Sequence, residues 1–215
     1  MKFFRNWGQP PFLKDIAEVF SRRVRSFGET PAGVLWKNSE GQQLRFEILA
    51  GILGDIQKPQ PVSICDFGCG YGAMFDFLSD WSALSQMTYT GYDISEEMIH
   101  AAWQRIHDPR ATFTEATKID QAADFTFVSG TYNLKLLVDD EPWNAYVKSS
   151  LKALWPMTNK GLAFNMLDIR HPDQGEGLYY ADASDFMDFC SELSDNIALV
   201  DDYPLQEWTI FVRRD

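Results

Sequence analysis

The sequence predicts an α/β fold, a doubly wound and mainly parallel sheet that follows an N-terminal helical extension. One observation is that short apolar runs alternate with helical patterns after about residue 60, which is typical of parallel strands joined by crossover helices. The other is the first of these runs, which starts at Val62, ends in Asp66 and leads into Gly68, Gly70 and Gly72. Glycines at alternate positions permit positive φ angles and bring backbone N–H groups close to a ligand.

Residues 1–60 are expected to form the helical extension and residues 61–215 the sheet-containing core. The first helix is expected over residues 15–27 and a second amphipathic helix over residues 44–53. The apolar positions of the first helix recur at helical spacing: Ile16, Val19, Phe20 and Val24.

The elements of the core follow in order along the chain. The second strand ends at Asp93, and Ser95 is expected to cap the next helix, with Glu96 and Glu97 in its first turn, where the helix dipole favours acids. The other ranges are a third strand ending near residue 115, a fourth strand from residue 123 that leads into the loop 129–133, a helix over 142–154, a fifth strand over 161–167, and a terminal pair of strands over 197–200 and 208–212.

Asp66 and the three glycines, with Asp93 following Asp66 by 27 positions, resemble two motifs of the class I S-adenosylmethionine-dependent methyltransferases. The terminal pair of strands resembles the antiparallel hairpin that closes the sheet of that family and that NAD-binding Rossmann domains lack. The resemblance implies seven strands in the order 3-2-1-4-5-7-6, the last one antiparallel, and S-adenosylmethionine as the cofactor. The glycine turn taken alone would also suit NAD. The chain also resembles a subgroup of small bacterial methyltransferases. This resemblance implies an architecture but not a particular reaction.

The resemblance also implies which residues surround the cofactor. Asp93 is expected to accept hydrogen bonds from the ribose hydroxyls, and Glu115 or the backbone of Ala116 to meet the adenine amine. Ligands of doubly wound sheets bind beyond the carboxyl ends of the strands, so the loop after the fourth strand should face the pocket. The expected cofactor-binding residues of the core are Asp66, Phe67, Gly68, Gly70, Tyr71, Gly72, Asp93, Ile94, Met98, Glu115, Ala116, Ser129 and Gly130.

Two residues of the extension are candidates for covering the methionine end of the cofactor. The forked donors of Arg45 suit a carboxylate, although an ion pair with Glu47 or another acid of the protein explains the arginine equally well. Trp36 is expected either in a lid, since aromatic faces attract the sulfonium cation, or in the core.

Methyl transfer asks the protein mainly to align a nucleophile with the methyl group and to exclude water. Tyr132 and Asn133, in the loop after the fourth strand, are therefore candidate catalytic residues. His171, in the polar loop after the fifth strand, is a candidate acid or base. Further candidates on the acceptor side are Asp168, Tyr179, Tyr180 and Asp182.

Composition narrows the class of partner. The formal charge is −12, and Lys and Arg cluster only at Arg22, Arg23 and Arg25, which disfavours a nucleic-acid substrate. No apolar run approaches the roughly 18 residues of a membrane span, and the start of the chain lacks a signal-peptide core, so a cytoplasmic location is expected. Three cysteines without finger spacing predict neither a disulfide nor a metal site.

The sequence therefore predicts an S-adenosylmethionine-dependent methyltransferase that acts on a nitrogen or oxygen atom of a small-molecule acceptor. Two alternatives stay open. One is an enzyme that uses the same sulfonium for cyclisation or elimination, and the other is a non-catalytic ligand-binding protein of the same fold. The sequence does not indicate an oligomeric state.

Overall fold

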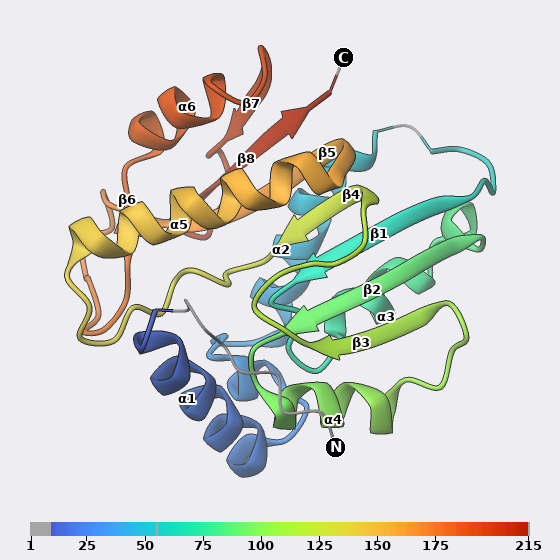
Figure 1. The fold of residues 1–215 in the computed structure, drawn as a ribbon, viewed down its shortest axis with the longest axis horizontal. Helices are drawn as coiled ribbons and strands as arrows, with labels where there is room; N and C mark the ends of the chain where they lie inside the picture. Colours follow the sequence, from blue (N-terminus) through green and yellow to red (C-terminus); the bar gives the residue numbers. More distant parts are fainter. Residues whose placement is uncertain (1–9, 55, 215) are drawn as a thin grey trace.

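A computed structural model describes residues 10–54 and 56–214 of the chain, and it places one sheet at the centre of the molecule (Figure 1). The strands of the described residues follow the order β3-β2-β1-β4-β5-β8-β7, with β6 beside the end of β5. All neighbours on this path are parallel except β8, which runs antiparallel to β5 and β7. The predicted fold class is confirmed.

The strand count differs from the expected seven by one short element. β6 has two residues and pairs in parallel with Leu167 and Asp168 of β5, so the terminal pair carries the numbers β7 and β8. The order is otherwise the expected one. The strands are β1 Val62–Phe67, β2 Met87–Asp93, β3 Ala111–Glu115, β4 Ala123–Val128, β5 Thr158–Asp168, β6 Tyr180–Ala181, β7 Asn196–Val200 and β8 Glu207–Arg213.

Three of the described α-helices begin after a residue whose side chain accepts a hydrogen bond from an N–H group of the first turn. Ser95 accepts a hydrogen bond from the Met98 N–H at 3.2 Å, as expected, and Asn38 caps the helix of the extension in the same way. The α-helices are α1 Phe12–Phe27, α2 Ser39–Ala50, α3 Ala73–Ser79, α4 Glu96–Arg105, α5 Asp140–Leu154 and α6 Ala183–Ser191, and the 3₁₀ turns are η1 Pro31–Val34, η2 Gly51–Leu53, η3 Ser82–Leu84 and η4 Trp155–Met157.

Helices cover both faces of the sheet because successive strand residues point to opposite sides. Ile64 of β1 packs in a cluster with residues of α2, α3 and α4, whereas its neighbour Cys65 packs in a second cluster with residues of α1, α5 and α6. Figure 1 shows α5 in front of the sheet, α2 and α3 behind it, and α1 beyond the arrowheads of β1, β2 and β3. The N-terminal helix thus lies at the carboxyl ends of the strands, where ligands of such sheets bind.

None of the helices within residues 10–54 and 56–214 has both the length and the apolar character that crossing a membrane requires.

Replacement of Trp208 by alanine tests the packing of β8 under α6. The indole is fully buried, contacts the rings of Phe164 and Phe186, and donates a hydrogen bond to the Ala181 carbonyl at 3.0 Å. We expect the free energy of unfolding in urea to fall by about 3 to 5 kcal/mol. Leu137→Ala is the control, since Leu137 is fully exposed and its loss should change stability by less than about 0.5 kcal/mol. Equal effects of the two changes would contradict the packing described.

Candidate functional site

The turn after β1 bends back over the end of β2. Gly68, Gly70 and Gly72 all adopt positive φ angles, of 86°, 55° and 82°. The N–H groups of Gly68 and Cys69 both donate to the Tyr92 carbonyl, at 2.7 and 3.0 Å. These bonds hold the turn against the tip of β2, and α3 begins directly after it at Ala73.

The carboxylate of Asp93 joins this turn to the start of α4. One oxygen accepts from the Gly70 N–H at 2.9 Å and the other from the Ser95 N–H at 2.8 Å. A carboxylate has about four acceptor positions, so each oxygen can still accept a bond from a ligand. Burial raises the pKa of Asp93 to about 6, although its backbone donors act in the opposite direction.

The carboxylate of Asp66 is the second acid at this end of the sheet. One oxygen accepts a hydrogen bond from the Tyr89 hydroxyl, whereas Oδ1 is buried and has no hydrogen-bond partner among the described residues. Burial, with a smaller contribution from the nearby Asp93 charge, raises the pKa of Asp66 to about 7 against the opposing effect of the Tyr89 bond. A buried carboxylate oxygen without a partner is costly, and a cationic ligand group would relieve that cost.

A cavity opens over these residues. Its floor is formed by the tips of β1, β2 and β4, and its walls come from α1, α5 and the segment from η1 to α2. The only charged side chains among its described lining residues are Asp66 and Asp93. Of the other polar atoms there, Ser129 Oγ is buried without a partner in the described part of the chain.

The loop after β4 forms one side of the cavity with Trp36. Gly130 has a φ of 64°, and a Cβ at that position would lie 2.3 Å from the Trp36 ring. The indole therefore lies directly on the backbone of Gly130, and only glycine fits there. Trp36 lines the cavity, and its role in covering a ligand stays a prediction.

The cavity brings together most of the residues that the sequence indicates. The predicted residues that line it are Trp36, Asp66, Phe67, Gly68, Gly70, Tyr71, Asp93, Ile94, Ala116, Ser129, Gly130 and Tyr132. The predicted residues that do not line it are Arg45, Gly72, Met98, Glu115, Asn133, Asp168, His171, Tyr179, Tyr180 and Asp182. Met98 is fully buried beneath the turn, in a cluster with Val24 and Tyr71, and Glu115 is exposed at the end of β3.

Arg45 has a partner from the protein itself. Its guanidinium forms a forked ion pair with Glu207, and both side chains are largely buried. The structure therefore displays the ion-pair alternative for Arg45, with Glu207 as the acid in place of Glu47.

The three candidate catalytic residues lie in different surroundings. The Tyr132 hydroxyl hydrogen-bonds to Ser150 Oγ at 2.7 Å, and burial holds its pKa well above the ordinary value. Asn133 lies behind the loop, where its Oδ1 accepts from the Leu167 N–H at 3.3 Å. His171 lines a separate hollow with Asp201 and Tyr203, and its Nδ1 accepts from the Asp173 N–H at 2.9 Å. Their catalytic roles stay predictions.

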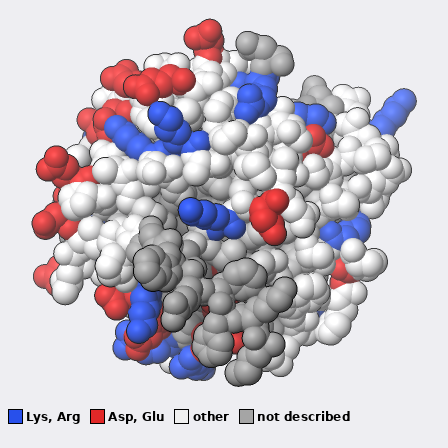
Figure 2. All heavy atoms as spheres, viewed as in Figure 1, with Lys and Arg blue, Asp and Glu red and all other residues white. Residues whose placement is uncertain are grey.

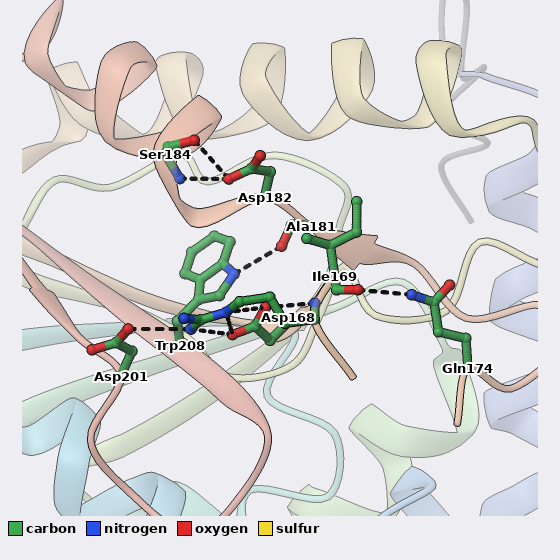
Figure 3. Close-up of polar contacts among 9 residues, drawn as sticks. Asp168, Ile169, Gln174, Ala181, Asp182, Ser184, Asp201 and Trp208 are labelled. Atoms are coloured by element: carbon green, nitrogen blue, oxygen red, sulfur yellow. Dashed lines mark hydrogen bonds and ion pairs between the residues drawn. The ribbon is translucent and has the colours of Figure 1, made fainter. Parts of the chain in front are cut away.

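The loop that carries His171 is fixed by its own hydrogen bonds. Arg170 bridges the carboxylates of Asp168 and Asp201. Gln174 donates to the Ile169 carbonyl at 2.9 Å (Figure 3). These contacts hold the His171 loop at the separate hollow, outside the lining of the cavity.

The sequence did not indicate most of the residues that form the cavity wall opposite the strand tips. Leu13, Ile16 and Phe20 of α1 and Trp143 and Tyr146 of α5 line the cavity. The spacing of Ile16 and Phe20 identifies an apolar helix face, but spacing does not say which part of the protein that face covers. The ring contacts of Phe12 with Trp143 and Tyr146, at 5.3 Å each, join the two helices.

Comparisons with known proteins agree with this geometry. A family model described as a methyltransferase domain matches residues 64–157. "Putative methyltransferase Rv1506c" of Mycobacterium tuberculosis is 37% identical over 164 residues, which are 74% of this chain and 97% of that protein. The chain belongs to the S-adenosylmethionine-dependent methyltransferases.

Solved structures show the same fold at low sequence identity. Magnesium protoporphyrin IX methyltransferase (ChlM) from Synechocystis PCC 6803 with bound S-adenosylmethionine has a TM-score of 0.69 and 15% identity, and the alignment covers 98% of this chain and all (100%) of that one. The complex of DhpI with S-adenosylhomocysteine has a TM-score of 0.62 and 14% identity, with 94% and 96% of the two chains covered.

The cavity fits the cofactor of the family. S-adenosylmethionine carries an ammonium and a sulfonium group, and the lining offers the unpartnered Asp66 Oδ1 and the second carboxylate of Asp93. Ser129 Oγ is a further free polar atom for a ligand, and the glycine turn leaves backbone accessible. Pairings of individual cofactor groups with individual residues stay predictions.

Asp93→Asn tests the bond between the turn and the tip of β2. An amide presents an NH₂ group to one of the two backbone donors, so one of the bonds from Gly70 and Ser95 is lost. We expect the Kd for S-adenosylmethionine to rise about 10- to 100-fold, the equivalent of one charge-assisted hydrogen bond. Calorimetric titration measures it, with the exposed Glu96→Gln as control. Affinity within twofold of wild type in a folded Asp93→Asn protein would be against the assignment.

Asp66→Asn tests the buried carboxylate through pH. The folded-state pKa of about 7 lies above the unfolded value near 3.8, so the folded protein holds its proton more tightly and loses stability as pH rises from about 4 to 7. We expect the ligand-free variant to gain stability relative to wild type over this range, by at most about 1.4 kcal/mol per pH unit. Urea unfolding of both proteins at pH 5, 6, 7 and 8 measures the difference, and a difference independent of pH would refute the shift.

Proposed function

We propose that this methyltransferase transfers the methyl group to a nitrogen or oxygen atom of a small-molecule acceptor that is neutral and largely apolar. The observation that carries the proposal is the chemical division of the cavity. The acids lie at the strand tips, where Asp66 and Asp93 are, and the wall from α1 and α5 is aliphatic and aromatic. A charged acceptor on that wall would lose its hydration without gaining a partner.

The polar groups of the acceptor side are largely occupied. The Trp143 indole donates to the Tyr132 carbonyl at 2.9 Å, and the Tyr132 hydroxyl is held by Ser150. The Tyr146 hydroxyl has no hydrogen bond to any described residue, and burial raises its pKa to about 12. Tyr146 therefore stays protonated at neutral pH, and it is suited to donate a hydrogen bond that orients the acceptor.

The surface supports a small acceptor more than a nucleic acid. Figure 2 shows acidic side chains gathered along the left-hand edge of the face in view, and Lys and Arg in separate groups among the described residues. The formal charge of −12 adds to the repulsion of phosphate backbones.

The residues of this chain act by placement. When bound, S-adenosylmethionine supplies a methyl group that its positive sulfur has already activated. Asp93 and the glycine turn fix the donor end, and Leu13, Ile16 and Phe20 exclude water from the opposite side. The proton of an amine or hydroxyl acceptor passes to solvent water as the new bond forms, and Tyr146 orients the acceptor without taking that proton.

Tyr146→Phe against Tyr180→Phe tests whether the acceptor is bound at the cavity. Tyr146 lines the cavity, whereas the Tyr180 hydroxyl lies near the His171 loop and accepts from the Gly175 N–H at 2.9 Å. With neutral aryl amines and phenols as acceptors, we expect Tyr146→Phe to raise KM about two- to tenfold, the worth of one neutral hydrogen bond. The affinity for S-adenosylmethionine should be unchanged, and Tyr180→Phe should behave as wild type.

The product identifies the reaction. The assay measures S-adenosylhomocysteine and methylthioadenosine by chromatography, with each neutral acceptor paired with an anionic analogue of the same ring. S-adenosylhomocysteine formed with the neutral member alone supports the proposal. Methylthioadenosine would instead indicate cyclisation or elimination, and tight binding without either product across the panel would favour a ligand-binding protein. Preference for the anionic analogues would overturn the apolar acceptor.

A further inference from the structure

Arg45 of α2 and Glu207 of β8 form an ion pair beside the cofactor cavity. Arg45 Nε lies 2.9 Å from both carboxylate oxygens, and a terminal nitrogen completes the fork. The exposed fractions of the two side chains are 11% and 2%, so the pair is removed from water. The acid lies 162 positions from the arginine in the chain.

The carboxylate side of the pair reaches the loop after β4. Asn165 Nδ2 donates to Glu207 Oε2 at 2.8 Å, and Asn165 Oδ1 accepts from the Gly130 N–H at 2.8 Å. Asn165 is itself buried. Glu207 therefore fixes the orientation of the amide that holds Gly130.

The guanidinium side of the pair reaches the same glycine from the opposite direction. Arg45 Cζ lies 3.9 Å from the centre of the Trp36 ring, and that ring lies on the backbone of Gly130. Trp36, Arg45, Glu207, Asn165 and Gly130 thus form a closed ring of contacts, which we call the bracket. Trp36 and Gly130 line the cavity, Arg45 and Asn165 do not, and Glu207 lines the separate hollow of His171.

Stability alone does not explain a charged pair at this place. Two buried charges lose their hydration, and uncharged residues of similar volume usually hold two elements together equally well. An arginine held by a forked ion pair does something that such residues do not, because the fork fixes the plane of the guanidinium against an aromatic face. The pair therefore supplies orientation at the rim of the cavity.

We propose that Arg45 and Glu207 are positioning residues, which hold Trp36 on Gly130 so that the rim of the cofactor cavity is in place before the ligand arrives. They act on the ligand through Trp36 and the Ser129–Gly130 turn. The inference rests on the proposed function only in that the cavity holds S-adenosylmethionine. It assigns a role to two residues that contact neither the methyl donor nor the methyl acceptor.

A double-mutant cycle tests the bracket. One variant combines Arg45→Met with Glu207→Gln, which removes both charges together and leaves an amide oxygen for Asn165. The second is Trp36→Ala, and the third carries all three changes. Lys148→Met with Asp185→Asn is the matched control, since that ion pair joins α5 to α6 away from the cavity. Calorimetry gives the Kd for S-adenosylmethionine, and urea unfolding gives the stability of each protein.

We expect the charge-removed pair and Trp36→Ala each to raise the Kd about tenfold relative to wild type. The triple variant should also raise the Kd about tenfold relative to wild type, and not a hundredfold, because the pair acts through the tryptophan. The control should bind as wild type. Wild-type affinity in the charge-removed protein, or additive effects in the triple variant, would overturn the inference. If the charge-removed protein does not fold, Arg45→Lys carries the test, since it keeps the charge and loses the fork. Failure of the wild type to bind would instead remove the proposed function.

Discussion

The carboxylate of Asp93, which accepts the N–H groups of Gly70 and Ser95, is the interaction on which the cavity depends. It joins the turn after β1 to the start of α4, and so it sets the separation of two neighbouring strand tips. The bonds from Gly68 and Cys69 to the Tyr92 carbonyl repeat the same connection one residue earlier. Every cavity residue from these two tips takes its place from this junction.

Two carboxylates at this end of the sheet are largely removed from water. Asp66 and Asp93 are both buried, and burial raises both pKa values. The ligand-free protein thus maintains a site at some cost in stability, which a cationic ligand can offset. A cationic ligand group beside Asp66 would give Oδ1 the partner that it lacks among the described residues.

Local sequence patterns predicted the parts of the fold that local interactions determine. The acid-tipped strands, the glycine turn and the Ser95 cap depend on residues a few positions apart, and the structure shows them where the sequence indicates. The two-residue strand β6 is too short to leave a pattern. The place of α1 is not encoded in its spacing, since Ile16 and Phe20 would make the same apolar face against any neighbour.

The residues around the cavity also divide into those that local sequence patterns locate and those that they do not. Asp66, Asp93 and Gly130 follow strands, so the architecture of parallel sheets locates them. The forked donors of Arg45 predict a carboxylate partner, but that partner, Glu207, lies on another element far along the chain. His171 follows a strand too, yet its loop lies at a separate hollow. Long-range pairing and loop direction are properties of the folded chain, and one sequence contains no local signal for them.

The position of Glu207 on β8 also bears on how the protein is made. During synthesis the glycine turn, Asp93 and Trp36 leave the ribosome well before β8, and the first strands can pair while the chain is still growing. The bracket closes only when the eighth strand has joined β5. A nascent chain can thus possess every residue expected to touch the cofactor and still lack a finished rim, so the bracket makes tight cofactor binding depend on the pairing of β8 with β5.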